Sequence, residues 1–193
     1  MKNSKFILFG PPGSGKGTFS SQIKKVLPSI VHISTGDIFR ENLKNETPLG
    51  KKAKSYMDKG ELVPDEVVIG MIRRKLKANK DARGFIFDGF PRTVDQAKAL
   101  DDLLNENNTP VSGMLSLEVE RQELINRLLN RGKMSGRADD QDQLVIENRI
   151  NVYNEKTSPL IEYYKKQGKY YSINGMGTIE EIAGRLKRVV EKL

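Results

Sequence analysis

The strongest chemical signal in the sequence is a glycine-rich stretch that carries one lysine and leads into a helical pattern. It spans residues 10–18 and reads GPPGSGKGT, with Lys16 as its cation. Glycines let the backbone curl so that successive N–H groups point inward, and the start of the following helix adds partial positive charge. Together with the charge of Lys16, these groups suit the β- and γ-phosphates of a nucleotide. We therefore predict a phosphate-binding loop, or P-loop, here.

The loop departs from the usual pattern in one place, which concerns the metal. Gly17 stands where Ser or Thr is usual, and Thr18 follows one residue later. Either the Thr18 hydroxyl takes the metal-binding role, or Mg²⁺ is held mostly by phosphates and water. A P-loop occurs in GTPases, motors, transporters and small-molecule kinases. A GTPase is disfavoured, because the nearest match to the base-reading N-K-x-D is NKDA at residues 79–82.

Further polar groups directly follow two other apolar, strand-like runs. Arg40 belongs to the string STGDIFR at residues 34–40, and Asp88 and Arg92 belong to DGFPRT at residues 88–93. Asp88 ends its strand as a Walker-B-type acid would, and could orient Mg²⁺ through water. The two arginines lie just beyond strand ends, where open α/β sheets bind ligands, and guanidinium groups suit phosphate. A surface salt bridge is the alternative for each arginine taken alone.

A second group of cations gathers around the polar segment 130–140. It consists of Arg127, Arg131, Arg137 and Arg149. Charge spreads over the equatorial oxygens during phosphoryl transfer, and several arginines near one loop would neutralise it. We expect Arg131 and Arg137 to be solvated and far from the phosphates in an open state. The alternative is surface pairing with nearby carboxylates, which are Glu123, Asp139 and Asp140.

Apolar patterns that alternate in period indicate the elements that must position these groups. Strands are predicted at residues 6–9, 30–33, 85–87, 114–117 and 170–173, with helical stripes between them. Alternating strands and helices imply βαβ units with right-handed crossovers. The predicted fold class is therefore α/β, a five-stranded parallel sheet of the P-loop NTPase type flanked by helices.

Two segments do not fit this alternation. Residues 35–78 hold too much helix for one crossover and are broken at Pro48 and Pro64, so part of them should project as a small lobe. Residues 130–140 are polar, contain two glycines and read as a loop that could act as a mobile lid. His32 lies within a predicted strand and is interpreted as a packing residue rather than a catalytic one.

Composition excludes several classes of protein. The chain has 193 residues, no cysteine and one histidine, so disulfide scaffolds, thiolate nucleophiles and cysteine-bound zinc are ruled out. No apolar run approaches the ~20 residues of a membrane helix, and residues 1–5 show no signal-peptide pattern. We therefore expect a cytoplasmic protein without a membrane partner. The net charge of +8 favours an anionic partner, which is nucleic acid, an anionic membrane or phosphorylated small molecules, and charge alone agrees equally well with a well-solvated surface.

Four strings in this order resemble the signatures of the adenylate kinase family of nucleoside monophosphate kinases: residues 10–18, 34–40, 60–65 and 88–93, with Gln96 behind the last. The resemblance runs from Lys5 to the C-terminus. It implies reversible, Mg²⁺-dependent transfer of the terminal phosphoryl group of ATP to AMP, giving two ADP. It also implies a single, monomeric domain over 1–193, with a monophosphate-binding lobe at about 34–63, a short lid at about 130–140 and no structural zinc.

The resemblance also assigns roles to residues. ATP would be bound by Gly13, Ser14, Gly15, Lys16, Gly17, Thr18, Arg127, Arg131 and Gly177, with Arg127 stacked on the base. AMP would be bound by Thr35, Arg40, Glu61, Leu62, Val63, Gly89, Phe90, Pro91, Arg92, Gln96, Arg137 and Arg149, with Gln96 at the adenine edge. The catalytic residues would be Lys16, Arg92, Arg131, Arg137 and Arg149, and Asp88 would bind the metal through water.

Three other functions compete with this interpretation. A UMP/CMP kinase of the same fold is disfavoured by Thr35 and the Thr93–Gln96 pair, since relatives that take pyrimidines usually differ there. A nucleotide sensor without turnover is disfavoured by the lid arginines, because a sensor needs no transition-state clamp. A nucleic-acid binder is suggested by the net charge alone.

Overall fold

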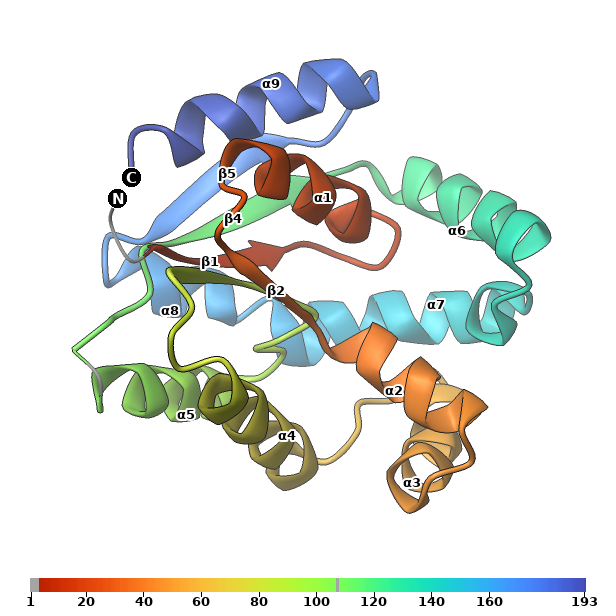
Figure 1. Ribbon diagram of the computed structural model, residues 1–193. Helices are drawn as coiled ribbons and strands as arrows, with labels where there is room; N and C mark the ends of the chain where they lie inside the picture. Colours follow the sequence, from red (N-terminus) through yellow and green to blue (C-terminus); the bar gives the residue numbers. More distant parts are fainter. Residues whose placement is uncertain (1–3, 107) are drawn as a thin grey trace.

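A computed structural model, which describes residues 4–106 and 108–193, shows a parallel sheet wrapped by helices (Figure 1). Residues 1–3, part of the segment expected to lack a signal peptide, lie outside the described residues. The strands run in the order β2-β3-β1-β4-β5, and every pairing is parallel. They are β1 (Ser4–Phe9), β2 (Val31–Ser34), β3 (Gly84–Asp88), β4 (Gly113–Glu118) and β5 (Tyr170–Asn174). The predicted fold class is confirmed.

Helices connect the strands and cover both faces of the sheet. They are α1 (Lys16–Val26), α2 (Thr35–Lys44), α3 (Pro48–Met57), α4 (Asp65–Ala78), α5 (Val94–Asn105), α6 (Arg121–Ser135), α7 (Gln143–Val152), α8 (Leu160–Lys165) and α9 (Ile179–Val190). Short 3₁₀ and π segments, Ala138–Asp140 and Tyr153–Thr157, flank α7. Within the described residues, we find no helix with the length and apolar character needed to span a membrane.

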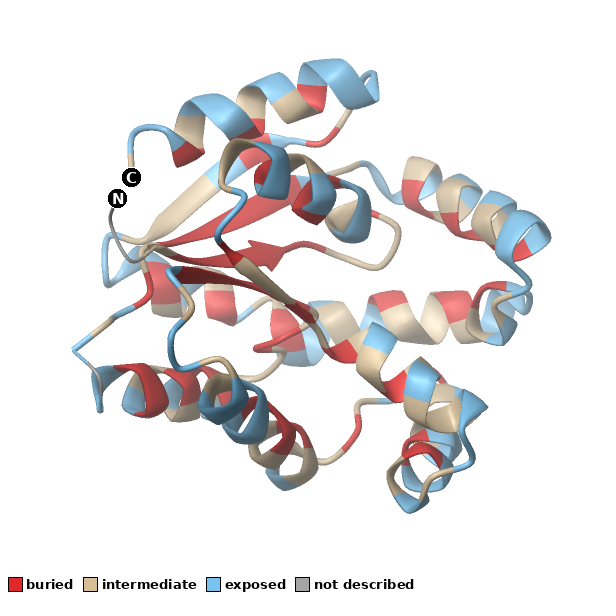
Figure 2. Cartoon of the chain, in the orientation of Figure 1, coloured by how far each residue is buried: buried red, intermediate tan, exposed pale blue. Residues whose placement is uncertain are grey.

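Alternate side chains of the strands build two cores, one on each face of the sheet. Ile7 and Phe87 point to the face covered by α4, α5 and α8, where they pack with Leu100 and Tyr164 among others. Phe6, Leu8 and Ile86 point to the opposite face, where they pack under α1 and α9. Figure 2 shows the strands buried between these helical layers. Burial on both faces explains why the strands read as continuous apolar runs.

The register of the central strands brings three chain segments to one edge of the sheet. Leu8 of β1 pairs with Asp88 of β3, and Ser34 of β2 pairs with the same Asp88. The three segments that leave these strands, at residues 10, 35 and 89, therefore start side by side. This carboxyl edge is where open parallel sheets bind ligands.

Helices α2 and α3 pack against each other and stand out from the sheet (Figure 1). Thr47 caps α3 through Gly50 N, and Pro48 takes the first helical position, which suits a residue without an N–H group. Pro64 precedes α4, whose apolar side joins the core. The prediction of a helical excess broken at both prolines, with part of it projecting, is confirmed.

The segment at residues 130–140 is not the loop that its composition predicts. Helix α6 continues to Ser135, Gly136 ends it with a left-handed conformation (φ 66°), and a 3₁₀ turn follows at residues 138–140. Gly132 lies inside this helix. Glycine is needed there because a Cβ would sit 2.4 Å from the Asp140 carbonyl oxygen. The glycine permits close approach of two backbones rather than breaking the helix.

Candidate active site

A cavity of about 510 Å³ opens at the carboxyl edge of the sheet. Its walls come from the P-loop, from α2, from segments 60–63 and 88–92, and from the region around α6 and α7. All four strings singled out in the sequence contribute to it. The predicted residues that line it are Gly13, Gly15, Lys16, Gly17, Thr18, Thr35, Arg40, Glu61, Leu62, Val63, Asp88, Gly89, Phe90, Pro91, Arg92, Gln96, Arg131, Arg137 and Arg149.

The P-loop is a tight turn whose shape depends on missing side chains. Gly13 has φ 84°, and a Cβ there would lie 2.9 Å from the Leu124 carbonyl oxygen. The Lys16 ammonium donates to the carbonyl oxygens of Gly10 at 2.8 Å and Pro11 at 3.0 Å. The loop and the lysine therefore form one compact, positively charged wall at the start of α1.

The charge of Lys16 is sensitive to its surroundings. Burial lowers the pKa of Lys16 to about 7, although the negative charge of Asp88 opposes that shift. Arg92, Arg149 and Arg131 add to the lowering by like-charge repulsion. An anion placed in the cavity would reverse these effects by stabilising the ammonium form.

Asp88 supplies a carboxylate next to the P-loop. It is 8% exposed, and its Oδ2 lies 4.0 Å from where a Cβ on Gly17 would be. His32, a partly buried residue of β2 that does not line the cavity, has its Nε2 3.4 Å from the same oxygen. One carboxylate beside a phosphate-binding loop suits Mg²⁺, which prefers oxygen ligands and completes its shell with phosphate and water.

Arg92 is held in place by the backbone around it. Its Nε donates to the Gly89 carbonyl oxygen at 2.9 Å, and its own carbonyl oxygen accepts from Thr157 Oγ1 at 2.8 Å. Burial, and then the positive charge of Arg149, lower the pKa of Arg92 to about 10, so it stays charged at neutral pH. Thr35 Oγ1 donates to the Gly89 carbonyl oxygen at 2.8 Å and joins the start of α2 to the same segment.

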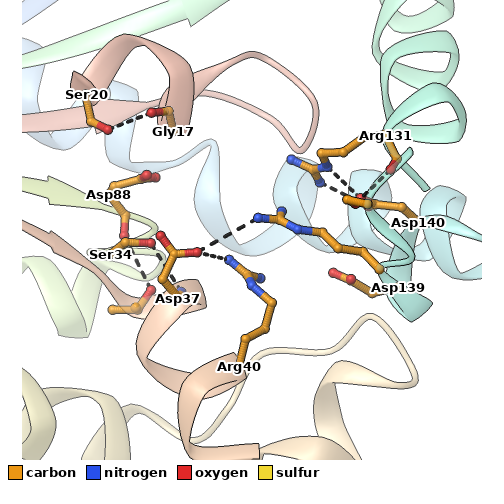
Figure 3. A network of polar contacts seen from close by, with 12 residues as sticks. Gly17, Ser20, Ser34, Asp37, Arg40, Asp88, Arg131, Asp139 and Asp140 are labelled. Carbon is orange, nitrogen blue, oxygen red and sulfur yellow. Dashed lines mark hydrogen bonds and ion pairs between the residues drawn. The ribbon is translucent and has the colours of Figure 1, made fainter. Parts of the chain in front are cut away.

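Two of the arginines around residues 130–140 converge on one buried carboxylate. Asp140 has no exposed surface; its two oxygens accept from Arg131 Nε at 2.6 Å and Arg131 Nη2 at 3.0 Å. Arg149 Nη1 donates to Asp140 Oδ1 at 2.6 Å (Figure 3 shows Arg131 with Asp140). Burial raises the pKa of Asp140, but the hydrogen bonds and charges of Arg131 and Arg149 outweigh it and hold the pKa below its usual value.

The lid region and the α2–α3 lobe face each other across the cavity. Arg137 Nη2 lies 3.9 Å from Asp37 Oδ1, and Arg40 Nη2 donates to the same oxygen at 2.5 Å (Figure 3). Arg131 and Arg137 are 36% and 28% exposed, so both side chains are partly buried. The arginines thus pair with carboxylates, the alternative noted above, and line the cavity at the same time.

Three predicted ATP-binding residues do not line this cavity. Ser14 is buried beneath the loop and lies 3.4 Å from Lys16 Nζ. Arg127 bonds to Glu123 at 2.6 Å and to the Gly175 carbonyl oxygen at 3.1 Å. Arg127 therefore reaches the loop after β5 that also carries Gly177.

The structure also adds cavity residues that sequence reasoning missed. Asp37 lies within residues 34–40, and Arg40 three residues later was the available signal. Tyr153 and Thr157 come from the π-helical turn after α7. The α8 helix that follows has no side-chain cap, because its N-cap residue is Pro159, whose side chain has no hydrogen-bonding group.

Comparison with known proteins agrees with this geometry. The family model described as Adenylate kinase matches residues 8–169. An adenylate kinase from Parabacteroides distasonis is 54% identical over 187 residues, covering 97% of each chain. Those from Flavobacterium psychrophilum and Leptospira biflexa are 52% and 48% identical, covering 97% and 96% of this chain and 98% and 99% of their own. The chain belongs to the adenylate kinase family of phosphotransferases.

Proposed function

We propose that this protein catalyses reversible, Mg²⁺-dependent transfer of the terminal phosphoryl group of ATP to AMP, giving two ADP. The supporting observation is that one cavity is lined by a P-loop with its lysine on one side and by Arg40 and Arg92 on another. Two phosphate-binding walls facing one space suit a donor nucleotide and an acceptor nucleotide better than a single ligand.

The chemistry needs position and charge rather than a covalent intermediate. The P-loop backbone and Lys16 hold the β- and γ-phosphates of ATP. Arg40 and Arg92 hold the phosphate of AMP, so that one of its oxygens faces the γ-phosphorus in line with the leaving oxygen. The buried and backbone-fixed guanidinium of Arg92 loses little freedom when it binds, and therefore positions the acceptor well.

Arg131, Arg137 and Arg149 neutralise the charge that spreads over the transferring group. Asp140 fixes Arg131 and Arg149 in one arrangement before any ligand binds, so little reorganisation is needed. We propose that residues 130–140 act as a short lid and residues 34–63 as the monophosphate lobe. Closing the two over the cavity would exclude water and prevent hydrolysis of ATP.

The carboxylate of Asp88 would hold Mg²⁺ by binding water molecules of its hydration shell. Thr18 lines the same cavity. When bound with ATP, the metal neutralises charge on the β- and γ-phosphates. Asp88 holds this position because its strand ends beside the P-loop.

The adenine bases of AMP and ATP bind at opposite ends of the site. Thr35, the backbone of Glu61, Leu62 and Val63, and the amide of Gln96 form the AMP nucleoside pocket. Segment 89–91 and Arg92 complete it. The adenine of ATP stacks on Arg127 and meets the backbone at Gly177, next to the carbonyl that Arg127 already contacts. We further propose a monomeric, cytoplasmic enzyme that needs no nucleic acid, membrane or zinc.

A coupled assay with ATP and AMP, UMP, CMP or GMP as acceptor tests this function. We expect AMP to be preferred over UMP and CMP by a wide margin in kcat/KM. Equal values for UMP would place the chain among pyrimidine-specific kinases, and binding of ATP and AMP without turnover would indicate a sensor. A nucleic-acid function would require DNA binding beyond the salt-sensitive attraction of any cationic protein.

A further inference from the structure

The side-chain amide of Gln96 is fixed at both of its ends. Gln96 is 1% exposed, stands in the first turn of α5 and lines the cavity. Its Nε2 donates to Asp65 Oδ1 at 2.7 Å, and its Oε1 accepts from the Arg92 backbone N–H at 2.7 Å. Asp65 begins α4, so this contact joins residues that are far apart in the sequence.

The partners of Gln96 permit only one orientation of the amide. The carboxylate of Asp65 can only accept, and the backbone N–H of Arg92 can only donate. Thr93 Oγ1 donates to the other carboxylate oxygen of Asp65 at 3.0 Å and so holds the carboxylate itself. Turning the Gln96 amide over would place oxygen against oxygen and N–H against N–H, with the loss of both hydrogen bonds.

This orientation has a consequence for the base that Gln96 meets. One N–H of Nε2 and one lone pair of Oε1 are left for a ligand. Adenine presents a donor at N6 beside an acceptor at N1, which matches that pair. Guanine presents the reverse, an acceptor at O6 beside a donor at N1, and would match only the inverted amide.

We propose that Asp65 is a positioning residue that sets the preference for AMP over GMP by locking the amide of Gln96. The proposal rests on the proposed function, in which Gln96 meets the acceptor base. Asp65 is not among the residues that line the cavity, so it acts through Gln96 rather than by touching the nucleotide. Sites built to complete a ligand's hydrogen bonds discriminate strongly against a ligand that leaves them unpaired.

Asp65→Asn tests the lock, because an asparagine amide can face either orientation of Gln96. The backbone N–H of Arg92 still favours the original orientation, so the relaxation is partial. We expect the ratio of kcat/KM for GMP to that for AMP to rise about tenfold or more, the value of one hydrogen bond to a charged group. We also expect kcat/KM for GMP to rise in absolute terms, which damage to the fold would not produce.

Glu66→Gln is the matched control. Glu66 lies beside Asp65 in the first turn of α4, is exposed, and has the same charge at the same helix start. The ratio of kcat/KM for GMP to that for AMP in Glu66→Gln should equal the ratio in the unchanged protein. Asp65→Ser provides a second variant, since a hydroxyl also donates or accepts. An unchanged GMP-to-AMP ratio in folded Asp65→Asn and Asp65→Ser overturns the proposal, whereas failure of the unchanged protein to use AMP overturns the proposed function instead.

A measurement on the unchanged protein decides the matter if both variants unfold. The two Nε2 protons of Gln96, identified by their loss in Gln96→Leu, should give separate, slowly exchanging NMR signals. AMP should shift them, and GMP at the same concentration should not. Equal shifts with both nucleotides would mean that the amide turns freely, and would overturn the lock.

Discussion

Lys16 combines a cationic role with an environment that weakens its charge. Its ammonium is bonded to the loop that it serves, and burial lowers its pKa to about 7. Burial therefore disfavours the charged form of the lysine in the free protein. Phosphate binding restores the full charge, which makes the lysine responsive to the ligand rather than permanently paired with Asp88.

Replacing Lys16 with methionine should abolish phosphoryl transfer without unfolding the protein. The methionine fills similar space but brings no charge to the phosphates, and single electrostatic contributions of this kind carry factors of about 10²–10³ in kcat. Circular dichroism and ADP production on the same sample measure both effects. Lys24→Met, an exposed lysine later in α1, is the control. Activity within tenfold of the unchanged protein would exclude the P-loop assignment.

The lowered pKa of Lys16 also predicts proton uptake when ATP binds. At pH 8 the lysine is mostly neutral in the free protein, because its pKa of about 7 lies below that pH. The phosphates raise the pKa again, so binding takes up as much as one proton, and affinity falls as pH rises above 7. Calorimetry in two buffers of different ionisation enthalpy measures this uptake. Heats that do not depend on the buffer, or equal uptake by Lys16→Met, would contradict it.

Helix α6 shows how packing at the scale of an element positions the lid arginines. Arg131 lies in its last turns, and Gly132 lets the backbone of Asp140 approach the helix closely. Asp140 can then meet both Arg131 and Arg149 from α7. The glycine, the buried carboxylate and the two arginines form one structural unit.

Gly132→Ala should destabilise this unit. A Cβ there would lie 2.4 Å from the Asp140 carbonyl oxygen, so the backbone must move, at a cost of about 1–3 kcal/mol. Displacing Asp140 should also lower kcat, because Arg131 and Arg149 lose their common partner. Thermal unfolding and steady-state kinetics measure the two effects.

Gly184→Ala in α9 is the matched control. That glycine is also helical, and a Cβ added to it would meet no atom within 4 Å beyond its own stretch of helix. Alanine should stabilise the helix there by about 0.5–1 kcal/mol. If Gly132→Ala gave the same gain, the close approach to Asp140 would have no energetic importance.

Elements with strong local signals were predictable from the sequence. The five strands, the P-loop and the prolines that begin α3 and precede α4 all follow from apolar runs, glycines and proline chemistry. The end of α6 was not predictable from the sequence, because its glycines and polar side chains favour a loop. Only the tertiary contact with Asp140 favours a helix over a loop there. The contact of Asp65 with Gln96 joins two helices and leaves no local pattern.

At the scale of the whole molecule, the sheet is a fixed base with two groups of helices on opposite sides of one cavity. The α2–α3 lobe carries Arg40 and Asp37, and Arg137 directly precedes the 3₁₀ turn at residues 138–140. The contact between Arg137 and Asp37 spans the cavity, although it is long at 3.9 Å. Burial, followed by repulsion from Arg40, lowers the pKa of Arg137. Both guanidinium groups contact the same carboxylate oxygen of Asp37, which partly offsets the repulsion between them.

This arrangement predicts that the two facing arginines affect catalysis differently. Arg137→Ala should lower kcat strongly and change KM for either nucleotide modestly, because the guanidinium acts mainly when charge spreads in the transition state. Arginines in related chemistry contribute factors of about 10³–10⁵, so a partial contributor still gives a large deficit. Arg40→Ala should instead raise KM for AMP and leave ATP affinity near normal, since Arg40 binds the acceptor in the ground state. Steady-state kinetics with each nucleotide varied separates the two patterns. Full kcat in Arg137→Ala would mean that the lid arginine only pairs with Asp37 and takes no part in transfer.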